Sequence, residues 1–287
     1  MRLRTIAFLA IAMAAFTLPA IAETPSMDEF IVYIPNEGRM IPATVCLPVG
    51  QPGETFPAVV MLHGTGSNRE EAGNGYRMLA PYMAENGIAS IRIDFAGSGD
   101  SAADYVEYTW SSGASDAAAA ADFMAKLAAV DPQRIGIMGW SQGGSVAILA
   151  ASRYSEFKAL LTWAGAVDMS AYMASQYAEA LVKGFTKMTF EWRTPLNLSL
   201  QWYEDVKSIS LRDELNNFYG PVLAIAGSAD EVVPLSALDD IVASAAGNDK
   251  AKLLIDGADH TFNVFTGDLG KYNELRNATT SWFKEKL

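Results

Sequence analysis

Hydrophobic residues along the chain fall into two kinds of short run, and the order of these runs predicts the fold. Segments 29–34 and 40–47 alternate apolar and polar positions on either side of Asn36-Glu37-Gly38, a pattern that predicts an antiparallel hairpin. The later apolar runs are unbroken, which is typical of strands buried on both faces of a sheet. These runs lie at 57–62, 88–93, 135–138, 160–164, 221–226 and 251–255.

Helical patterns separate these expected strands. A small-residue helix follows Ser141, and an alanine-rich helix is expected from a cap at Ser115 or Asp116 to about Val130. Further amphipathic patterns cover 70–86, 235–246 and 271–284. Strands that alternate with helices in this way form a mostly parallel sheet with helices on both faces, so we expect the α/β class.

Residues 168–212 interrupt the alternation. They lie between two expected sheet strands and are too irregular for a crossover helix alone, so we expect a short cap insertion here. Aromatic and methionine residues are concentrated in it, namely Met169, Tyr172, Met173, Tyr177, Phe185, Met188, Phe190, Trp192, Trp202 and Tyr203. The chain has no internal repeat and no low-complexity linker, which favours one domain over residues 23–287 with this insertion at about 168–212.

The first 22 residues have the pattern of a secretory signal peptide. Arg2 and Arg4 form a basic start, an apolar stretch covers 6–18, and Ala20-Ile21-Ala22 provides a small-x-small cleavage site. The apolar stretch is short for a membrane span, and no later segment is long enough to be one. We therefore expect cleavage near Ala22, a periplasmic or secreted location and no membrane span in the mature chain. The alternative is an uncleaved anchor.

Charge and cysteine content narrow the function classes. The formal net charge is −12, and loss of the two leader arginines makes it −14. An acidic protein repels nucleic acid and anionic lipid, so neither is an expected partner. Cys46 is the single cysteine, which excludes an internal disulfide, and its place in an alternating run predicts a small buried apolar residue. Nothing in the pattern indicates an oligomeric state.

The segment Gly139-Trp140-Ser141-Gln142-Gly143 lies between an expected strand and an expected helix. Gly-x-Ser-x-Gly in that setting predicts a sharp turn that lifts the Ser141 hydroxyl above the sheet edge. The two outer glycines let strand and helix approach each other, and the N-terminus of the helix favours negative charge beside the serine. The alternative is a plain glycine-rich turn. However, glycine costs about 1 kcal/mol relative to alanine in a helix, so Gly143 and Gly144 indicate a local requirement.

A serine nucleophile needs a base and an acid. In α/β-hydrolases the order along the chain is serine, acid, histidine, and of the two histidines only His260 follows Ser141. His260 is therefore the expected base, and His63 is expected to brace a glycine loop through hydrogen bonds. Asp230, just after the strand at 221–226, is the expected acid that orients the imidazole.

Two other carboxylates compete with Asp230 for the role of the acid. Asp168 lies at the end of the preceding strand, and Glu231 is adjacent to Asp230. Asp256 and Asp259 are too near His260 in sequence to reach its ring easily.

Acyl transfer also needs N–H donors for the tetrahedral oxyanion. We expect one from the backbone of Gln142, just after the nucleophile, and one from Thr65 in the loop after the strand at 57–62. A phosphate-cradling role for His63-Gly64-Thr65-Gly66 is the alternative, but this segment lacks the Lys-Ser/Thr ending of a P-loop and the spacing of a dinucleotide fingerprint. No group of residues has metal-site spacing, so neither a metal nor another cofactor is expected.

Five segments in order, "LHGTGSNRE", "IRIDFAGSGDS", "DPQRIGIMGWSQGG", "GSADEVVP" and "GADHTF", resemble the α/β-hydrolase fold enzymes. The resemblance runs from about residue 28 to 287. Within this range, the five segments resemble those of bacterial esterases that include the cinnamoyl (feruloyl) esterases. They also resemble those of dienelactone-hydrolase and prolyl-oligopeptidase-type catalytic domains. It implies triad positions at Ser141, Asp230 and His260, and oxyanion positions at Thr65 and Gln142.

The same resemblance shows departures that bear on function. Dienelactone hydrolases use a cysteine nucleophile where this chain has Ser141, and the propeller of prolyl oligopeptidases has no counterpart in this sequence. Cinnamoyl esterases carry a short insertion over the site, where this chain has residues 168–212.

We therefore expect an exported serine hydrolase that cleaves small-molecule carboxylic esters through an acyl-enzyme. Alternatives are a peptidase or acyltransferase with the same triad, or a noncatalytic binding protein on this fold. The insertion is expected to roof an apolar pocket, and the alternative is that it packs on the domain without forming a pocket wall.

Overall fold

The computed structural model describes residues 27–287, with the backbone alone described at 170–175. The leader expected at 1–22 lies outside the described residues. Within the described part, no helix is both long and apolar enough to cross a membrane.

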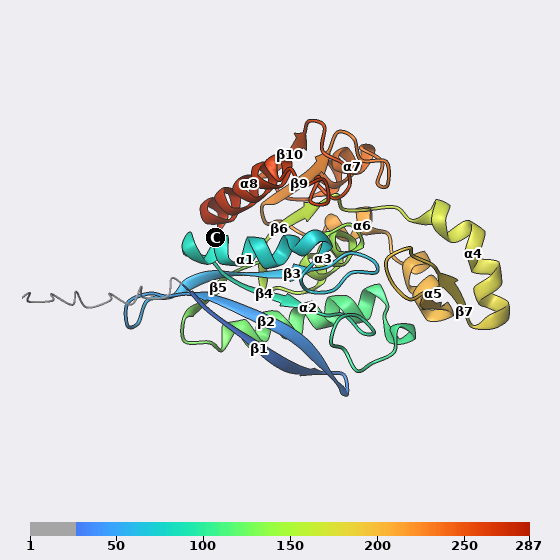
Figure 1. Ribbon diagram of the computed structural model, residues 1–287, viewed down its shortest axis with the longest axis horizontal. Coiled ribbons are helices and arrows are strands. Elements are labelled where there is room, and N and C mark those ends of the chain that lie inside the picture. Colours follow the sequence, from blue (N-terminus) through green and yellow to red (C-terminus); the bar gives the residue numbers. More distant parts are fainter. Residues whose placement is uncertain (1–26) are drawn as a thin grey trace, which may run out of the picture.

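An eight-stranded sheet forms the centre of the molecule, in the order β1-β2-β4-β3-β5-β6-β9-β10 (Figure 1). β1 and β2 form the expected antiparallel hairpin, β2 is antiparallel to β4, and every pairing from β4 to β10 is parallel. The fold is therefore an α/β-hydrolase fold, as expected, and the carboxyl ends of its parallel strands share one edge. The strands are β1 (Met27–Asn36), β2 (Arg39–Pro48), β3 (Phe56–Leu62), β4 (Ala89–Ile93), β5 (Val130–Trp140), β6 (Phe157–Trp163), β9 (Val222–Gly227) and β10 (Lys250–Ile255).

Helices cover both faces of this sheet. Successive side chains of a strand point to opposite faces, so in β3 Val60 packs in one core cluster and Val59 in the other. On the Val59 face α1 and α8 lie side by side, and α2, α3 and α7 cover the Val60 face (Figure 1). These helices are α1 (Gly75–Glu85), α2 (Trp110–Ala125), α3 (Gln142–Arg153), α7 (Ser236–Ser244) and α8 (Gly270–Lys286).

Two helices have boundaries that differ clearly from those expected. The helix expected at 70–86 starts only at Gly75, because Glu71 has a positive φ of 63° and a 3-10 turn follows it. The alanine-rich helix starts at Trp110, since the Thr109 side chain accepts the Ser112 N–H and caps the helix there. A cap at Ser115 or Asp116 was wrong, and so was the end near Val130. Asp116 lies inside the helix and is buried, with its carboxylate bonded to Arg39 (2.7 Å).

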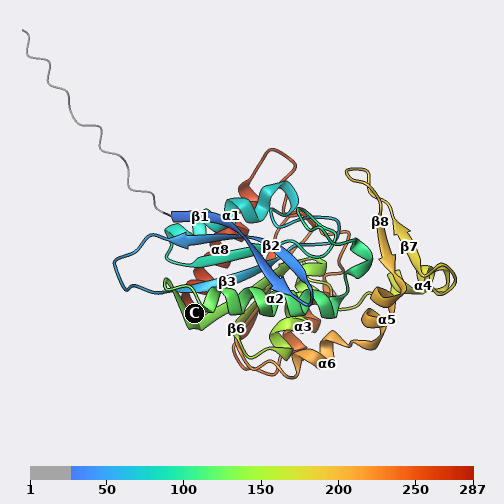
Figure 2. The ribbon, with the colours of Figure 1, turned by 90° about the horizontal axis from the view of Figure 1, so that it is seen from below.

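The stretch between β6 and β9 contains three helices and a separate two-stranded antiparallel sheet. We refer to residues 168–215 as the cap. Figures 1 and 2 both show α4, α5 and β7 at one end of the molecule, beyond the main sheet. The elements are α4 (Ser170–Lys183), β7 (Phe185–Met188), β8 (Leu196–Ser199), α5 (Leu200–Ser208) and α6 (Leu211–Leu215).

Cys46 is fully buried, which confirms the expectation of a small core residue. It lies beside Ala80 and Ala84 of α1. Burial, followed by the nearby Glu29 carboxylate, raises the pKa of the thiol to about 11. The thiol is therefore neutral at pH 7 and is a poor nucleophile.

Candidate active site

Ser141 stands at the sharp turn between β5 and α3. Its backbone has φ 54° and ψ −122°, a conformation that is strained for a residue with a side chain. A Cβ atom at residue 143 would lie 2.1 Å from the Leu62 carbonyl oxygen, and one at residue 139 would lie 2.0 Å from the Gly143 carbonyl oxygen. Both glycines are therefore required by close backbone packing. The geometry is that of a nucleophile elbow.

Asp230 and His260 form a hydrogen-bonded pair at the same edge of the sheet. Asp230 follows β9 and His260 follows β10, and these strands are neighbours. The His260 Nδ1 lies 2.9 Å from Asp230 Oδ2, while Asp230 Oδ1 accepts the N–H groups of Val232 (2.8 Å) and Val233 (3.0 Å). With Nδ1–H donated to the carboxylate, Nε2 is left to accept a proton.

The environment of Asp230 keeps it ionised. Its side chain is fully buried, and burial raises the pKa of the carboxyl. The hydrogen bonds from His260 and from the backbone of Val233 and Val232 outweigh burial, so the pKa lies below its ordinary value. An ionised carboxylate orients the ring and stabilises the imidazolium that forms when His260 takes a proton.

The main chain of His260 is tied to the nucleophile elbow. Its carbonyl oxygen accepts the indole N–H of Trp140 (3.1 Å), the residue before Ser141, and the Trp140 ring packs edge-on against Phe262. Among the hydrogen bonds of residues 27–287, none joins Ser141 and His260 directly. Such bonds between nucleophile and base are often long without substrate and tighten in the substrate complex.

The competing carboxylates lie elsewhere. Asp168 is half-exposed and lies 3.6 Å from Arg212 at the start of the cap. Glu231 is exposed, and Asp259 accepts the N–H groups of Thr261 and Asn263 within its own turn. Asp230 is the carboxylate bonded to the imidazole.

Thr65 and Gln142 lie where the expected oxyanion donors should be. Gln142 is the first residue of α3 and is buried, and N–H groups in the first turn of a helix lack intrahelical acceptors. Thr65 follows β3 in the loop 63–71, which we call the oxyanion loop, and its N–H donates to no backbone acceptor in the described chain. Gly143, next to Gln142, packs directly under the end of β3. Both N–H groups are therefore available beside Ser141.

His63 braces the oxyanion loop, as expected. Its Nδ1 lies 2.8 Å from the Gly64 carbonyl oxygen and its Nε2 accepts the Phe95 N–H (3.2 Å), so Nδ1 carries the proton. Burial lowers the pKa of His63, which keeps the ring neutral. The Gly64–Thr65 peptide is planar and trans, so holding its carbonyl also fixes the direction of the Thr65 N–H.

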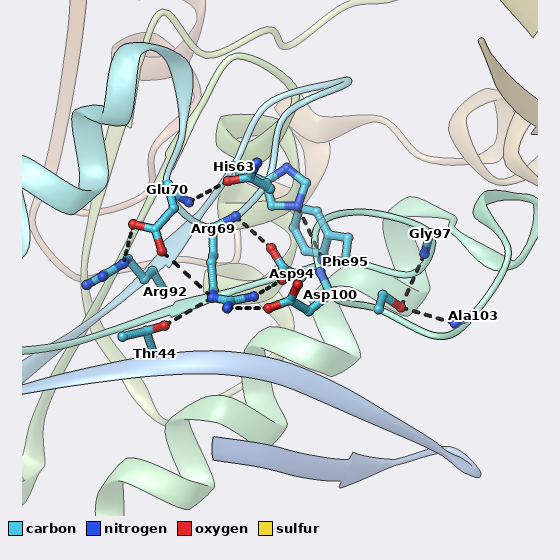
Figure 3. A network of polar contacts seen from close by, with 12 residues as sticks. Thr44, His63, Arg69, Glu70, Arg92, Asp94, Phe95, Gly97, Asp100 and Ala103 are labelled. Carbon is cyan, nitrogen blue, oxygen red and sulfur yellow. Dashed lines mark hydrogen bonds and ion pairs between the residues drawn. The ribbon is translucent and has the colours of Figure 1, made fainter. Parts of the chain in front are cut away.

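A charged network that sequence reasoning missed joins Arg69 of the same loop to residues of neighbouring elements (Figure 3). Arg69 donates its backbone N–H to Asp94 Oδ1 (2.7 Å), and its guanidinium bonds Asp94, Asp100 (2.6 Å) and Thr44 (3.0 Å). Asp94 and Asp100 belong to the loop after β4. The network therefore ties the oxyanion loop to its neighbour. It was not visible in the sequence because these partners lie 25 or more positions from Arg69.

The turn between β7 and β8 reaches the oxyanion loop. A Cβ atom at Gly66 would lie 2.9 Å from the Phe190 ring, and Arg193 donates to the Gly66 carbonyl oxygen (2.8 Å).

A separate cavity of about 510 Å³ lies between cap and core, and none of its lining residues is a triad residue. The lining includes Trp110, Val167, Met169, Tyr177, Leu181 and Arg212. No group of residues that could hold a metal ion occurs in the described chain.

Comparison with known proteins places this geometry in a family. The model of the prolyl oligopeptidase family matches residues 74–287, more than half of the chain. The chain belongs to the prolyl oligopeptidase family and has the α/β-hydrolase fold.

A curated relative and two solved structures are similar to this chain. The 2,6-dihydropseudooxynicotine hydrolase of Paenarthrobacter nicotinovorans is 27% identical over 231 residues, which is 78% of this chain and 56% of the relative. The chain thus spans little more than half of that relative. Est1E from Butyrivibrio proteoclasticus with bound ferulic acid has a TM-score of 0.71 at 21% identity, covering 89% of this chain and 98% of Est1E. A puromycin-hydrolyzing peptidase of Mycobacterium tuberculosis has a TM-score of 0.68 at 22% identity, and the match covers 93% of this chain and 41% of the peptidase.

Proposed function

We propose that this chain is a serine hydrolase that cleaves carboxylic esters of small molecules through an acyl-enzyme on Ser141. The observation that carries the proposal is the His260–Asp230 pair (2.9 Å), which is tied through Trp140 to a strained serine elbow. A buried, ionised carboxylate that holds an imidazole in one tautomer is what general-base activation of a serine requires. A noncatalytic binding protein would need neither the pair nor the strained turn.

The proposed reaction has two halves. His260 Nε2 removes the proton of the Ser141 hydroxyl, whose oxygen attacks the ester carbonyl. The oxyanion accepts the N–H groups of Thr65 and Gln142, and the N-terminus of α3 favours the same charge. His260 then gives its proton to the leaving alcohol, and afterwards activates a water molecule that hydrolyses the acyl-enzyme.

The proposed substrate class follows from the surroundings of the oxyanion loop. The Phe190 ring on Gly66 is an apolar surface beside the carbonyl position, suited to the acyl or aryl part of an ester. The solved structure of Est1E with ferulic acid, an aromatic acid, is consistent with such a ligand on a similar fold. The formal net charge of −12 supports the further proposal that nucleic acid is not a partner.

A peptidase is the second candidate, and two observations favour it. The family is named for prolyl oligopeptidases, and one structural neighbour is a puromycin-hydrolyzing peptidase. The same triad would serve, with an amine as the leaving group in place of an alcohol.

A substrate panel separates the two candidates. Purified protein is assayed with esters that range from acetyl through medium acyl to hydroxycinnamoyl, and with aminoacyl amides, alongside Ser141→Ala. We expect short-to-medium or aryl esters to be cleaved faster than amides, and Ser141→Ala to lose on the order of 10⁴-fold or more in kcat. Faster cleavage of the amides would replace the esterase with a peptidase.

We also propose that the protein is exported and loses residues 1–22. The basic start and the small-x-small site support this. N-terminal sequencing of the protein recovered outside the cytoplasm is expected to begin at Glu23, and an intact Met1 would exclude cleavage.

A further inference from the structure

Glu71, the last residue of the oxyanion loop, carries a buried carboxylate to which the proposed reaction assigns no role. Glu71 as a whole is 8% exposed. Its backbone has φ 63° and ψ 175°, a conformation that residues with side chains rarely adopt. Its Oε2 accepts the Gly64 N–H (2.6 Å) and its Oε1 accepts the Ala72 N–H (2.9 Å). Strain of this kind persists where the surrounding structure requires it, and here it accompanies the bond to Gly64.

The Glu71 carboxylate and the nucleophile lie close to the same residue. A Cβ atom at Gly64 would lie 3.3 Å from Ser141 Cβ and 3.8 Å from Glu71 Oε2. Gly64 is also the residue whose carbonyl His63 holds (2.8 Å). Its two peptide units are therefore fixed by two different side chains, the N–H by Glu71 and the carbonyl by His63. Because the peptide unit is planar, these two bonds together fix the direction in which the Thr65 N–H points.

On this basis, and resting on the proposed function, we propose that Glu71 is a positioning residue that aims the Thr65 N–H at the oxyanion by holding the Gly64 N–H. A bond from an N–H to a carboxylate is roughly twice as strong as one to a neutral acceptor, so the ionised side chain holds the loop more firmly.

The surroundings of Glu71 allow this control to operate near neutral pH. Burial raises the pKa of Glu71 to about 7, against the opposing effects of the bonds from Gly64, Ala72 and Ser67 and of nearby His260. Tyr76 of α1 also faces it, but burial raises the pKa of that phenol well above 10, so it stays neutral. Arg193 and Asp94 act on His63, on the other side of Gly64.

The test compares wild type with Glu71→Gln, which keeps an acceptor for Gly64 but has no charge to gain or lose. At about pH 8.5 we expect wild type to exceed Glu71→Gln by about tenfold in kcat, with KM changed less than about twofold, because the interaction serves the transition state. At about pH 5.5 wild-type Glu71 is protonated and resembles glutamine, so the ratio should approach one. Glu85→Gln, the same change of charge on the exposed end of α1, is the matched control and should give a ratio of one throughout.

A second readout is the free energy of unfolding. Because the folded-state pKa of Glu71 is raised, its protonated form stabilises the protein fully below about pH 4.5, and this contribution is lost as pH rises through about pH 7. Urea titrations should show this loss in wild type and in Glu85→Gln, but not in Glu71→Gln. If Glu71→Gln does not fold, Glu71→Asp takes its place. Its shorter side chain keeps the charge but reaches Gly64 less well, so kcat should fall at every pH while the pH dependence remains.

Two results would overturn the proposal. One is a ratio of wild type to Glu71→Gln that is constant from about pH 5.5 to about pH 8.5. The other is an effect confined to KM. Ser141→Ala, assayed in parallel, keeps the two proposals apart, because undiminished activity there contradicts the proposed function itself, whatever Glu71 does.

Discussion

The edge of the main sheet and the cap are built in different ways, although both surround the same site. At the sheet edge, Asp230 and the Gly64 peptide units are held in place by several hydrogen bonds. Asp230 has three hydrogen bonds, and His63 and Glu71 hold both sides of Gly64. The cap instead exposes large apolar side chains, with Trp192 at 74% and Val182 at 86%. Fixed groups suit chemistry that needs precise geometry, and we propose that the cap contributes instead to selection among substrates.

The largest effect is expected when a charged group is removed from the sheet edge. Asp230→Asn should lower kcat by on the order of 10⁴-fold, because an amide leaves the imidazole in the wrong tautomer. Asp168→Asn, at the start of the cap, is the matched control and should cost little, since that side chain is half-exposed beside Arg212. If the two losses are exchanged, the acid is Asp168. Steady-state kinetics on the best ester of the panel supply the measurement.

The next effect concerns stability. Gly143→Ala places a methyl group 2.1 Å from the Leu62 carbonyl oxygen, so the elbow must shift, at an expected cost of about 3 kcal/mol in the free energy of unfolding. Gly184→Ala, at the end of α4 in the cap, meets nothing within 4 Å and should cost only about 1 kcal/mol for its left-handed φ of 81°. Urea denaturation compares the two variants. Equal costs would mean that the elbow is no more tightly packed than the cap.

The smallest effect concerns the contribution of the cap to substrate preference. Phe190→Ala should change the preference between aryl and short acyl esters by about 1 to 3 kcal/mol in kcat/KM, as one pocket contact does. Val182→Ala, which is exposed on α4, should leave that preference unchanged. Equal losses on every ester after Phe190→Ala would show that Phe190 supports the oxyanion loop and selects nothing.

The sequence predicted the sheet edge better than the cap, for physical reasons. Ser141, Asp230 and His260 each follow a strand in a short glycine-containing turn, so local pattern and chain order were enough to place them at one edge. The strand before His260 was wrongly expected to be buried on both faces, because β10 is the last strand of the sheet and half of its residues are exposed. Glu71 and Arg69 were missed because their partners are backbone groups and distant carboxylates, which a linear pattern does not show. The helix expected from residue 70 reflected apolar spacing, whereas the strained Glu71 backbone delays its start to Gly75.

In the cap, composition predicted apolar surface but not its placement. Trp202 and Tyr203 are buried in the cap's own packing, while Trp192 is exposed and Phe190 contacts Gly66. Which aromatic residue meets the site depends on the turn between β7 and β8, and no sequence pattern indicated that hairpin.

The central claim, a serine nucleophile activated by His260, is tested most directly by covalent labelling. The protein is treated with an organophosphonate, digested, and the modified peptide is located by mass spectrometry. We expect one label per chain, on Ser141, with none in Ser141→Ala and much slower labelling in Asp230→Asn because His260 is no longer held as a base. A label on another residue, or continued ester hydrolysis with no label at all, would contradict the claim.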